Sequence, residues 1–334
     1  LFSTYLASFT AVVASYIFPQ TITLTESMKS ESITAPGGMG DIITGLFQNL
    51  IANPVSAVAE GNYLGILFWS IIIGLALKKF AGEATQTMML NFSDAITQVV
   101  RWIINLAPFG ILGLVFDAVS ESGFDIFVTY GKLMLLLVGT MLTVALIINP
   151  LIVAVTLRRN PYPLVFRCLR ESGVTAFFTR SSAANIPVNM TLCEKLGLDR
   201  DMYSVSIPLG STINMDGASV TITIMTLATA HTLGIEVAFP TAMILSFLSA
   251  LAACGTSGVT GGSLLLIPMA CSLFGIPDSV SMQVVGVGFI IGVVQDSMET
   301  AINSSGDVLF TATAEYAHWK KQGKRLPDFL GGKK

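Results

Sequence analysis

Three long stretches of the sequence carry no Asp, Glu, Lys or Arg, and they constrain the fold more than any other feature. Residues 133–157, 237–277 and 279–295 form uncharged runs of 25, 41 and 17 residues. As a helix, the first run would span roughly 37 Å, more than the ~30 Å apolar core of a bilayer. Only 12% of the 334 residues are charged, against about 25% in soluble domains. The sequence therefore predicts an all-α polytopic membrane protein.

Apolar segments separated by polar or basic turns give the order of the expected helices. Basic residues at 78–79, 158–159 and 320–325 should face the cytoplasm, because cytoplasmic loops are enriched in Lys and Arg. We therefore expect a cytoplasmic C-terminus, with residues 320–334 as a basic tail. Because Leu1 already lies in an apolar run, we expect earlier helices in the complete protein. The expected helices span residues 1–18, 42–59, 61–77, 99–119, 124–157, 204–233, 238–277 and 284–309, with a polar loop at 20–41 and an amphipathic helix at 79–98.

Two pairs of short segments have the form of helical hairpins with tips of small residues. Residues 163–179 and 185–197 flank Arg180-Ser-Ser-Ala-Ala184, and residues 238–254 and 263–277 flank a tip at 255–262. These segments are shorter than the ~20 residues of an ordinary span. Two re-entrant hairpins, one in each half of the region, are typical of inverted-repeat transporters. Ordinary spans joined by small-residue loops are the alternative.

The stretch Gly210-Ser-Thr-Ile-Asn-Met-Asp-Gly217 places glycines, an amide and a carboxylate inside apolar sequence. Unpaired backbone groups are costly in lipid, so such a break survives only inside the protein or along a cavity. Carbonyl oxygens freed between Gly210 and Gly217, together with the oxygens of Asn214 and Asp216, suit a hard cation such as sodium. A kink closed by its own Ser and Thr side chains is the alternative.

The last apolar segment carries polar residues on one helix face. At roughly 100° per residue these positions fall within an arc of about 100°. An acid at mid-membrane costs on the order of 2.5–3.5 kcal/mol by insertion scales, so cations or donors should meet these side chains. Asp307 could instead lie at the membrane–water interface. Asp296 directly follows the uncharged run 279–295, so an interfacial position does not easily explain it. The residues of this face are Asp296, Glu299, Thr300, Asn303 and Asp307.

Arg180 is an isolated cation at the first hairpin tip, and we expect it to meet Asp296 or Glu299. Ser181 and Ser182 offer hydroxyl and N–H groups near the start of the second arm, where a helix N-terminus favours carboxylates. Together these groups suit a zwitterionic amino acid. The tips would bind its carboxylate, an acid would bind its ammonium group, and the carbonyls would bind sodium.

Other functions fit the sequence less well. A net charge of -3 without a dense basic block argues against nucleic-acid binding. The four cysteines form no C-x-x-C pair, and two histidines are too few for a metal site. Gly255-Thr-Ser-Gly258 matches the G-x-S-G of rhomboid intramembrane proteases, so a serine protease is the alternative function. The only later histidine, His318, lies in the basic tail. An ion channel without an organic substrate would not explain two hairpin tips that suit a zwitterion.

Taken together, these motifs resemble the dicarboxylate/amino acid:cation symporter family, which contains the glutamate transporters. Within it the chain looks most like the bacterial sodium:serine/threonine symporters, notably in residues 181–187, 261–268 and 295–300. The order and spacing of the motifs fit from about Leu1 to Trp319. The family motifs are Thr179-Arg-Ser-Ser182, Asn214-Met-Asp-Gly217, Gly255-Thr-Ser-Gly-Val259 and the polar last helix through Asn303 and Asp307.

The resemblance implies a glutamate-transporter-homologue fold and sodium-coupled import of serine and threonine. It implies a homotrimer in the lipid of a bacterial inner membrane, in which a transport domain slides against a scaffold. Residues 1–119 would be mainly scaffold and residues 120–319 mainly transport domain. The transport domain would hold hairpin 1 (163–197), the unwound helix (204–233), hairpin 2 (238–277) and the polar last helix (284–317).

Residue by residue, the resemblance also implies where substrate and sodium bind. Ser182, Val259, Asp296, Thr300 and Asn303 would hold the substrate's α-amino and α-carboxylate groups. One sodium site would use Gly210, Asn214, Asn303 and Asp307, and a second would use Thr212 with the backbone of Ala253, Cys254 and Thr256. A third site in some relatives uses Asp216 with residues of an earlier helix, which we expect to be absent from this chain.

Two positions depart from the relatives that take acidic substrates. Those relatives carry Arg at the position of Glu299 and Thr at that of Ala218, and both groups receive the substrate's side-chain carboxylate. Because Glu299 is anionic and Ala218 lacks a hydroxyl, the resemblance implies neutral amino acids as substrates.

Overall fold

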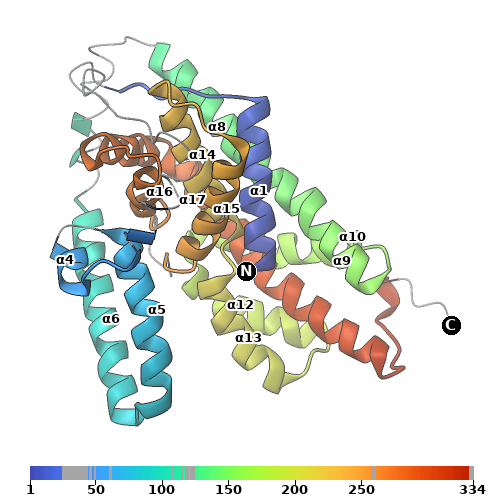
Figure 1. Cartoon of the computed structure of the whole chain (residues 1–334). Helices are drawn as coiled ribbons and strands as arrows, with labels where there is room; N and C mark the ends of the chain where they lie inside the picture. The colour runs from blue at the N-terminus through green and yellow to red at the C-terminus, as the bar shows by residue number, and fades with distance from the viewer. Residues whose placement is uncertain are drawn as a thin grey trace.

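The computed structural model describes residues 1–24, 44, 47–48, 50–59, 62–106, 109–110, 112–113, 116, 120, 125–256 and 261–330. All regular secondary structure in these residues is helical, as the sequence predicts (Figure 1). The helices are α1 (Phe2–Ile17), α4 (Pro54–Ala59), α5 (Tyr63–Phe80), α6 (Glu83–Ile104), α8 (Asp125–Thr143), α9 (Asn149–Leu157), α10 (Tyr162–Cys168), α11 (Val174–Thr179), α12 (Ser182–Lys195), α13 (Arg200–Ile213), α14 (Asp216–Thr232), α15 (Phe239–Ala253), α16 (Ile267–Ser272) and α17 (Asp278–Lys321).

The helix expected at 124–157 consists of α8 and α9, joined by the π-helical turn η1 (Val144–Ile148). It ends at Arg158, whose left-handed φ of 52° turns the chain out of the helical path. Within the described residues, 128–157 and α17 are the two helices long and apolar enough to cross a membrane.

The break expected at 210–217 is shorter than predicted. Helix α13 continues through Ile213 and α14 starts at Asp216, so only Asn214 and Met215 interrupt the helix. The Gly210 carbonyl still accepts a hydrogen bond from the Asn214 N–H at 2.8 Å. The prediction of freed carbonyls from Gly210 onward is therefore wrong at Gly210, because the turn that begins there closes normally.

Helical arms occupy both segments expected as hairpins. Hairpin 1 consists of α10, the π-helical turn η2 (Leu169–Gly173) and α11 in its first arm, and α12 in its second. The second arm begins at Ser182 and not at Asn185, because the Ser181 side chain accepts a hydrogen bond from the Ala184 N–H and caps the helix. Hairpin 2 consists of α15, the 3₁₀ turn η3 (Leu264–Leu266) and α16, and its tip residues 257–260 lie outside the described residues.

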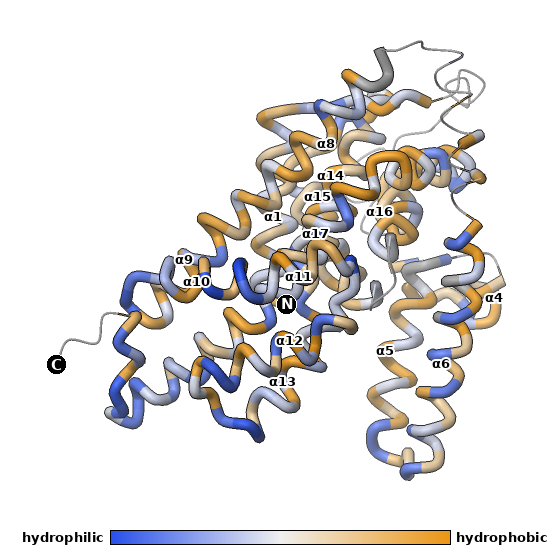
Figure 2. The backbone as a smooth tube through the Cα atoms, turned by 180° about the vertical axis from the view of Figure 1, so that it is seen from behind, coloured by the Kyte–Doolittle hydropathy of each residue, from blue (hydrophilic) through white to orange (hydrophobic). Residues whose placement is uncertain are grey.

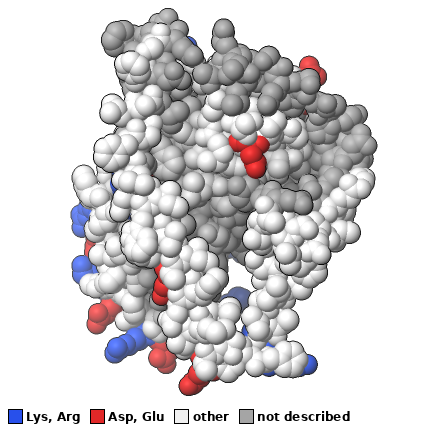
Figure 3. Space-filling view, turned by 90° about the vertical axis from the view of Figure 1, so that its left-hand side faces the viewer, with Lys and Arg blue, Asp and Glu red and all other residues white. Residues whose placement is uncertain are grey.

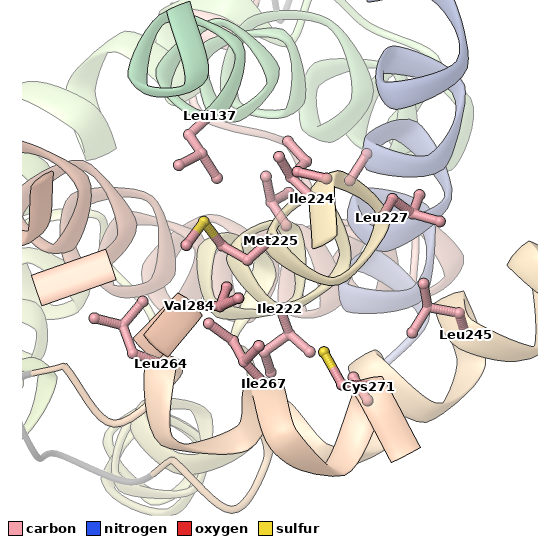
Figure 4. Close-up of a cluster of buried hydrophobic side chains, with 14 of the residues drawn as sticks. Leu137, Ile222, Ile224, Met225, Leu227, Leu245, Leu264, Ile267, Cys271 and Val284 are labelled. Carbon is pink, nitrogen blue, oxygen red and sulfur yellow. The ribbon is translucent and has the colours of Figure 1, made fainter. Parts of the chain in front are cut away.

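Helix α17 lies at the centre of the fold and is longer than the expected 284–317. Its 44 residues extend roughly 66 Å, and it contacts both hairpins, α13 and α14. Buried apolar side chains of α14 pack against α8 and both arms of hairpin 2 (Figure 4). Because lipid tails are as apolar as leucine, close packing and buried polar contacts hold such helices together.

Helices α5 and α6 form an antiparallel pair beside this core (Figure 1). Residues 79–80 of the segment expected to be an amphipathic helix end α5, and residues 83–98 lie in α6, which ends at Ile104 and so covers only the start of the helix expected at 99–119. Apolar side chains such as Ile73, Leu75 and Leu90 on this pair are exposed, and the tube coloured by hydropathy is hydrophobic along much of both helices (Figure 2).

The segment expected as a free basic tail is folded as far as Leu330. The 3₁₀ turn η4 (Asp328–Leu330) packs against α10, where Leu330 is buried and the Arg167 guanidinium lies 5.8 Å from the centre of the Phe329 ring. Charged side chains gather toward the lower end of one face, while much of the rest is uncharged (Figure 3).

Candidate functional site

The tip of hairpin 1 meets α17 through an ion pair. Arg180, held in a left-handed conformation with φ 51°, donates from Nε to Asp296 Oδ2 at 2.7 Å. The other oxygen, Oδ1, accepts a hydrogen bond from the Gly261 N–H at 3.1 Å. Asp296 is only 4% exposed, so its carboxylate is shielded from bulk water, whereas the Arg180 side chain is 30% exposed. Of the two partners expected for Arg180, the structure selects Asp296, and Asp296 links the two hairpins.

Glu299 is satisfied by neutral groups. Its Oε2 accepts hydrogen bonds from Thr221 Oγ1 and Ser263 Oγ, both at 2.8 Å, and from Gln295 Nε2. These donors come from α14, hairpin 2 and α17. Gly217 leaves room for this packing, since a Cβ there would lie 2.7 Å from Glu299 Cα.

A small cavity opens between the hairpin 1 tip, the α13–α14 break and α17. Its volume of about 20 Å³ is sufficient for a water molecule. Most residues predicted to bind substrate border it, whereas Ala218 is fully buried within α14 and Ser181 caps α12. Val259 lies outside the described residues. The lining residues are Arg180, Ser182, Met215, Thr256, Asp296, Glu299, Thr300 and Asn303.

The residues predicted for the first sodium site meet beside this cavity. Asn214 Nδ2 donates to the Asn303 carbonyl at 3.1 Å and to Asp307 Oδ1 at 3.2 Å. Gly210 faces the same carboxylate, because a Cβ there would lie 2.8 Å from Asp307 Oδ1. The second oxygen, Asp307 Oδ2, is buried with no hydrogen-bond partner among the described residues.

This donor set fits a hard monovalent cation. It offers one carboxylate with carbonyl and amide oxygens, which are the ligands that hard cations prefer. The part of the chain that the structure describes contains no group of three or more His, Cys, Asp or Glu able to hold a metal ion. A transition-metal site is therefore not supported there. In the structure the Asn214 amide nitrogen faces Asp307, while its oxygen accepts a hydrogen bond from the Ser3 hydroxyl.

The residues predicted for the second sodium site lie where α13 and α15 end. Cys254 Sγ donates to the Ile213 carbonyl at 3.6 Å, which brings the end of α15 to the α13–α14 break. The Thr256 hydroxyl donates to the Ala253 carbonyl, and the Thr212 hydroxyl to the Leu209 carbonyl. The hydroxyls of Thr212 and Thr256 are thus engaged with their own helices.

Asp216, which the resemblance links to a third cation site, has polar neighbours from two helices of this chain. It is completely buried, and Asn149 Nδ2 donates to its Oδ2 at 3.0 Å. The Ser3 and Thr4 side chains of α1 also approach it. The sequence analysis missed these partners, although an amide inside an uncharged membrane segment, as at Asn149, is by itself a signal of function.

Comparison with known proteins decides the family. The profile of the sodium:dicarboxylate symporter family matches residues 1–316. The chain belongs to this family. A protein of Bifidobacterium adolescentis named serine/threonine transporter SstT is 60% identical over all 334 residues, which cover 77% of that relative. Proteins of the same name from Streptococcus agalactiae and Streptococcus thermophilus are 59% and 58% identical over 96% of this chain and 79% of their own lengths.

Membership of the sodium:dicarboxylate symporter family confirms the resemblance seen in the sequence. It makes the chain a membrane transport protein and not an enzyme. The intramembrane protease alternative, which rested on Gly255-Thr-Ser-Gly258, has no support.

Proposed function

We propose that this chain belongs to a sodium-coupled symporter that imports serine and threonine. About 60% identity along the whole chain to a relative named serine/threonine transporter supports the substrate class. The observation that carries the proposal is the cavity at which Arg180, Asp296, Thr300 and Asn303 converge beside the Asp307 carboxylate. Such a site combines an anion-binding cation, an ammonium-binding acid and an oxygen-lined ion site.

The substrate would lie between the hairpin tips and α17. Asp296 would receive the ammonium group, with Thr300 and Asn303 as further polar contacts. The α-carboxylate would bind at the hairpin tips, to the N-terminus of α12 at Ser181 and Ser182 and to Val259, because helix N-terminal N–H groups favour anions. Arg180 adds a positive charge at the same tip.

Glu299 and Ala218 would restrict the substrate to neutral amino acids. A second carboxylate on the substrate would meet the Glu299 carboxylate in a buried site. Two like charges about 4 Å apart repel by roughly 4 kcal/mol at an effective dielectric constant of 20. A hydroxyl, by contrast, can donate to Glu299. Ala218, which is packed in the core, would act through the space it leaves and not through contact.

Sodium would bind at two places near the substrate. One site would consist of Gly210, Asn214, Asn303 and Asp307, and its support is the unpartnered Asp307 Oδ2. The second would lie at the junction of Thr212 with the end of α15, where Ala253, Cys254 and Thr256 supply oxygens. Asp216 would contribute to a further cation site.

The family resemblance implies an elevator mechanism in a homotrimer, and the proposal extends to both. Residues 120–319 would form most of the moving transport domain, with both hairpins re-entrant in an inverted repeat, and residues 1–119 most of the scaffold. The exposed apolar faces of α5 and α6 would contact lipid or neighbouring subunits. The membrane would be the bacterial inner membrane, with the folded basic segment after α17 on the cytoplasmic side.

Uptake by proteoliposomes tests this function. The full-length protein is reconstituted, and uptake of labelled serine is measured with an inward sodium gradient and with sodium replaced by choline. We expect uptake only with sodium, and competition by unlabelled threonine but not by aspartate. Equal serine uptake in choline would exclude sodium coupling, and no uptake of either amino acid would exclude the substrate class.

A further inference from the structure

A second buried polar cluster lies between α1, α9 and α14, next to the α13–α14 break. Its centre is Asp216, which is 0% exposed. Oδ2 accepts one hydrogen bond from Asn149 Nδ2 at 3.0 Å, while Oδ1 has no partner in the described part of the chain. A buried carboxylate that has mainly neutral donors keeps an uncompensated charge, which is costly unless a cation neutralises it.

Oxygen atoms of α1 and α9 complete the surroundings of this carboxylate. The Ser3 hydroxyl donates to Asn214 Oδ1 at 3.0 Å, and the Ser219 hydroxyl donates to the Thr4 carbonyl at 3.0 Å, so α1 is fixed against α14. Thr4 Oγ1 and Asn149 Oδ1 are buried and, within the described ranges, accept and donate no hydrogen bond. Unsatisfied oxygens of this kind suit a hard cation.

The π-helical turn before α9 explains how Asn149 reaches Asp216. One extra residue in a turn rotates the residues that follow by roughly 100° about the helix axis. Asn149 and Pro150 are buried, and Asn149 bonds to Asp216 of α14, while Ile147 and Leu151 on either side are more than half exposed. π-turns are frequent at functional sites, and this one turns an amide into the core.

We propose that Asn149 is a positioning residue for a cation that binds at Asp216. Its amide N–H holds Oδ2 toward α9, so that Oδ1 stays available to the ion. Because the amide is uncharged, it fixes the carboxylate without cancelling the charge that attracts the cation. This inference rests on the proposed sodium-coupled function.

Sodium binding can be measured without transport. The full-length protein is purified without substrate, and its thermal unfolding is followed while sodium replaces choline at constant ionic strength. A ligand that binds only the folded state raises stability with its concentration relative to Kd. Asn149→Leu keeps the approximate volume and removes the donor. We expect it to raise the sodium concentration needed for a given stabilisation at least tenfold.

Asn189→Leu is the matched control. Asn189, in the second arm of hairpin 1, is also a completely buried amide, but it donates to the Ser304 carbonyl of α17. Its loss should lower the unfolding temperature at every sodium concentration and leave the sodium dependence unchanged. If the two variants shift the sodium dependence equally, Asn149 has only a structural role and the inference is wrong.

A double variant separates positioning from independent effects. Because Asn149 acts through Asp216, Asp216→Asn with Asn149→Leu should shift the sodium dependence no more than Asp216→Asn alone. Additive shifts would overturn the inference. If Asn149→Leu does not fold, Asn149→Gln, whose longer side chain displaces the donor, should shift the dependence several-fold, and an unchanged dependence would also overturn it.

The wild-type protein distinguishes this inference from the proposed function. Sodium-driven serine uptake, together with an unchanged sodium dependence in the Asn149 variants, would overturn the role of Asn149 alone. Serine uptake that does not depend on sodium, with no stabilisation by sodium, would overturn both.

Discussion

Gly210→Ala tests whether the Asp307 carboxylate holds a sodium ion. A Cβ at residue 210 would lie 2.8 Å from Asp307 Oδ1 and 3.1 Å from Cγ, whereas ordinary van der Waals contact begins at 3.4 Å. In a close-packed interior the carboxylate has to move by about 0.6 Å to make room. The hydrogen bond of 3.2 Å from Asn214 Nδ2 to the same oxygen would be distorted with it.

The size of the effect follows from the cost of this overpacking. Extra methyl groups in a well-packed core cost typically about 1–3 kcal/mol. If that cost falls on the geometry needed to bind the ion, sodium affinity decreases roughly 5- to 140-fold, at 1.4 kcal/mol for each factor of ten. Alanine is favoured over glycine inside a helix by about 0.5–1 kcal/mol, so the stability of the fold should change less than the affinity for sodium.

The measurement is the initial rate of serine uptake against sodium concentration, at saturating serine. We expect Gly210→Ala to need roughly 5- to 140-fold more sodium than wild type for half-maximal uptake. Gly292→Ala is the control, because no described atom lies within 4 Å of its added Cβ, and it should behave as wild type. Normal uptake by Gly210→Ala with an unchanged sodium requirement would show that Asp307 does not bind the ion.

Four further substitutions test other parts of the site. Asp296→Asn should abolish serine binding even at saturating sodium, whereas Asp307→Asn should mainly raise the sodium requirement; identical sodium titrations would refute this division. Gly217→Ala should lower the unfolding temperature far more than Gly292→Ala, because its Cβ would meet Glu299 backbone atoms at 2.7 and 2.9 Å; equal unfolding temperatures would contradict the packing. Glu299→Gln removes the repulsion of a second carboxylate, so aspartate should begin to inhibit serine uptake, and no inhibition would refute that role.

The sequence predicted what depends on helical periodicity and on charge. Uncharged runs predicted helices at 133–157 and 279–295, and both lie within long helices of the structure. Because residues on one helix face stay together, Asp296, Thr300 and Asn303 border the same cavity. The meeting of Asn214 with Asp307, from different helices, followed only from the family resemblance, since periodicity cannot show which faces of two helices meet.

Partner choice and local irregularity were not predictable. A period of 3.6 residues places Asp296 and Glu299 on one helix face but does not assign their partners. The packing of hairpin 2 brings Ser263 to Glu299, while Arg180 pairs with Asp296. The π-turn before Asn149 has no sequence signature, because its residues are ordinary apolar ones. The break after Ile213 proved shorter because the preceding turn keeps its backbone hydrogen bond.

The contacts of hairpin 2 connect substrate choice with access to the cavity. A space of about 20 Å³ holds a water molecule and not an amino acid, so binding requires neighbouring groups to move. The Gly261 N–H and the Ser263 hydroxyl are bound to Asp296 and Glu299, and moving them away removes one donor from each acid. In the proposed binding mode, serine would bring an ammonium group to Asp296 and a hydroxyl to Glu299, so that both buried acids would keep a donor. Aspartate would bring only the ammonium group, and its second carboxylate would face Glu299.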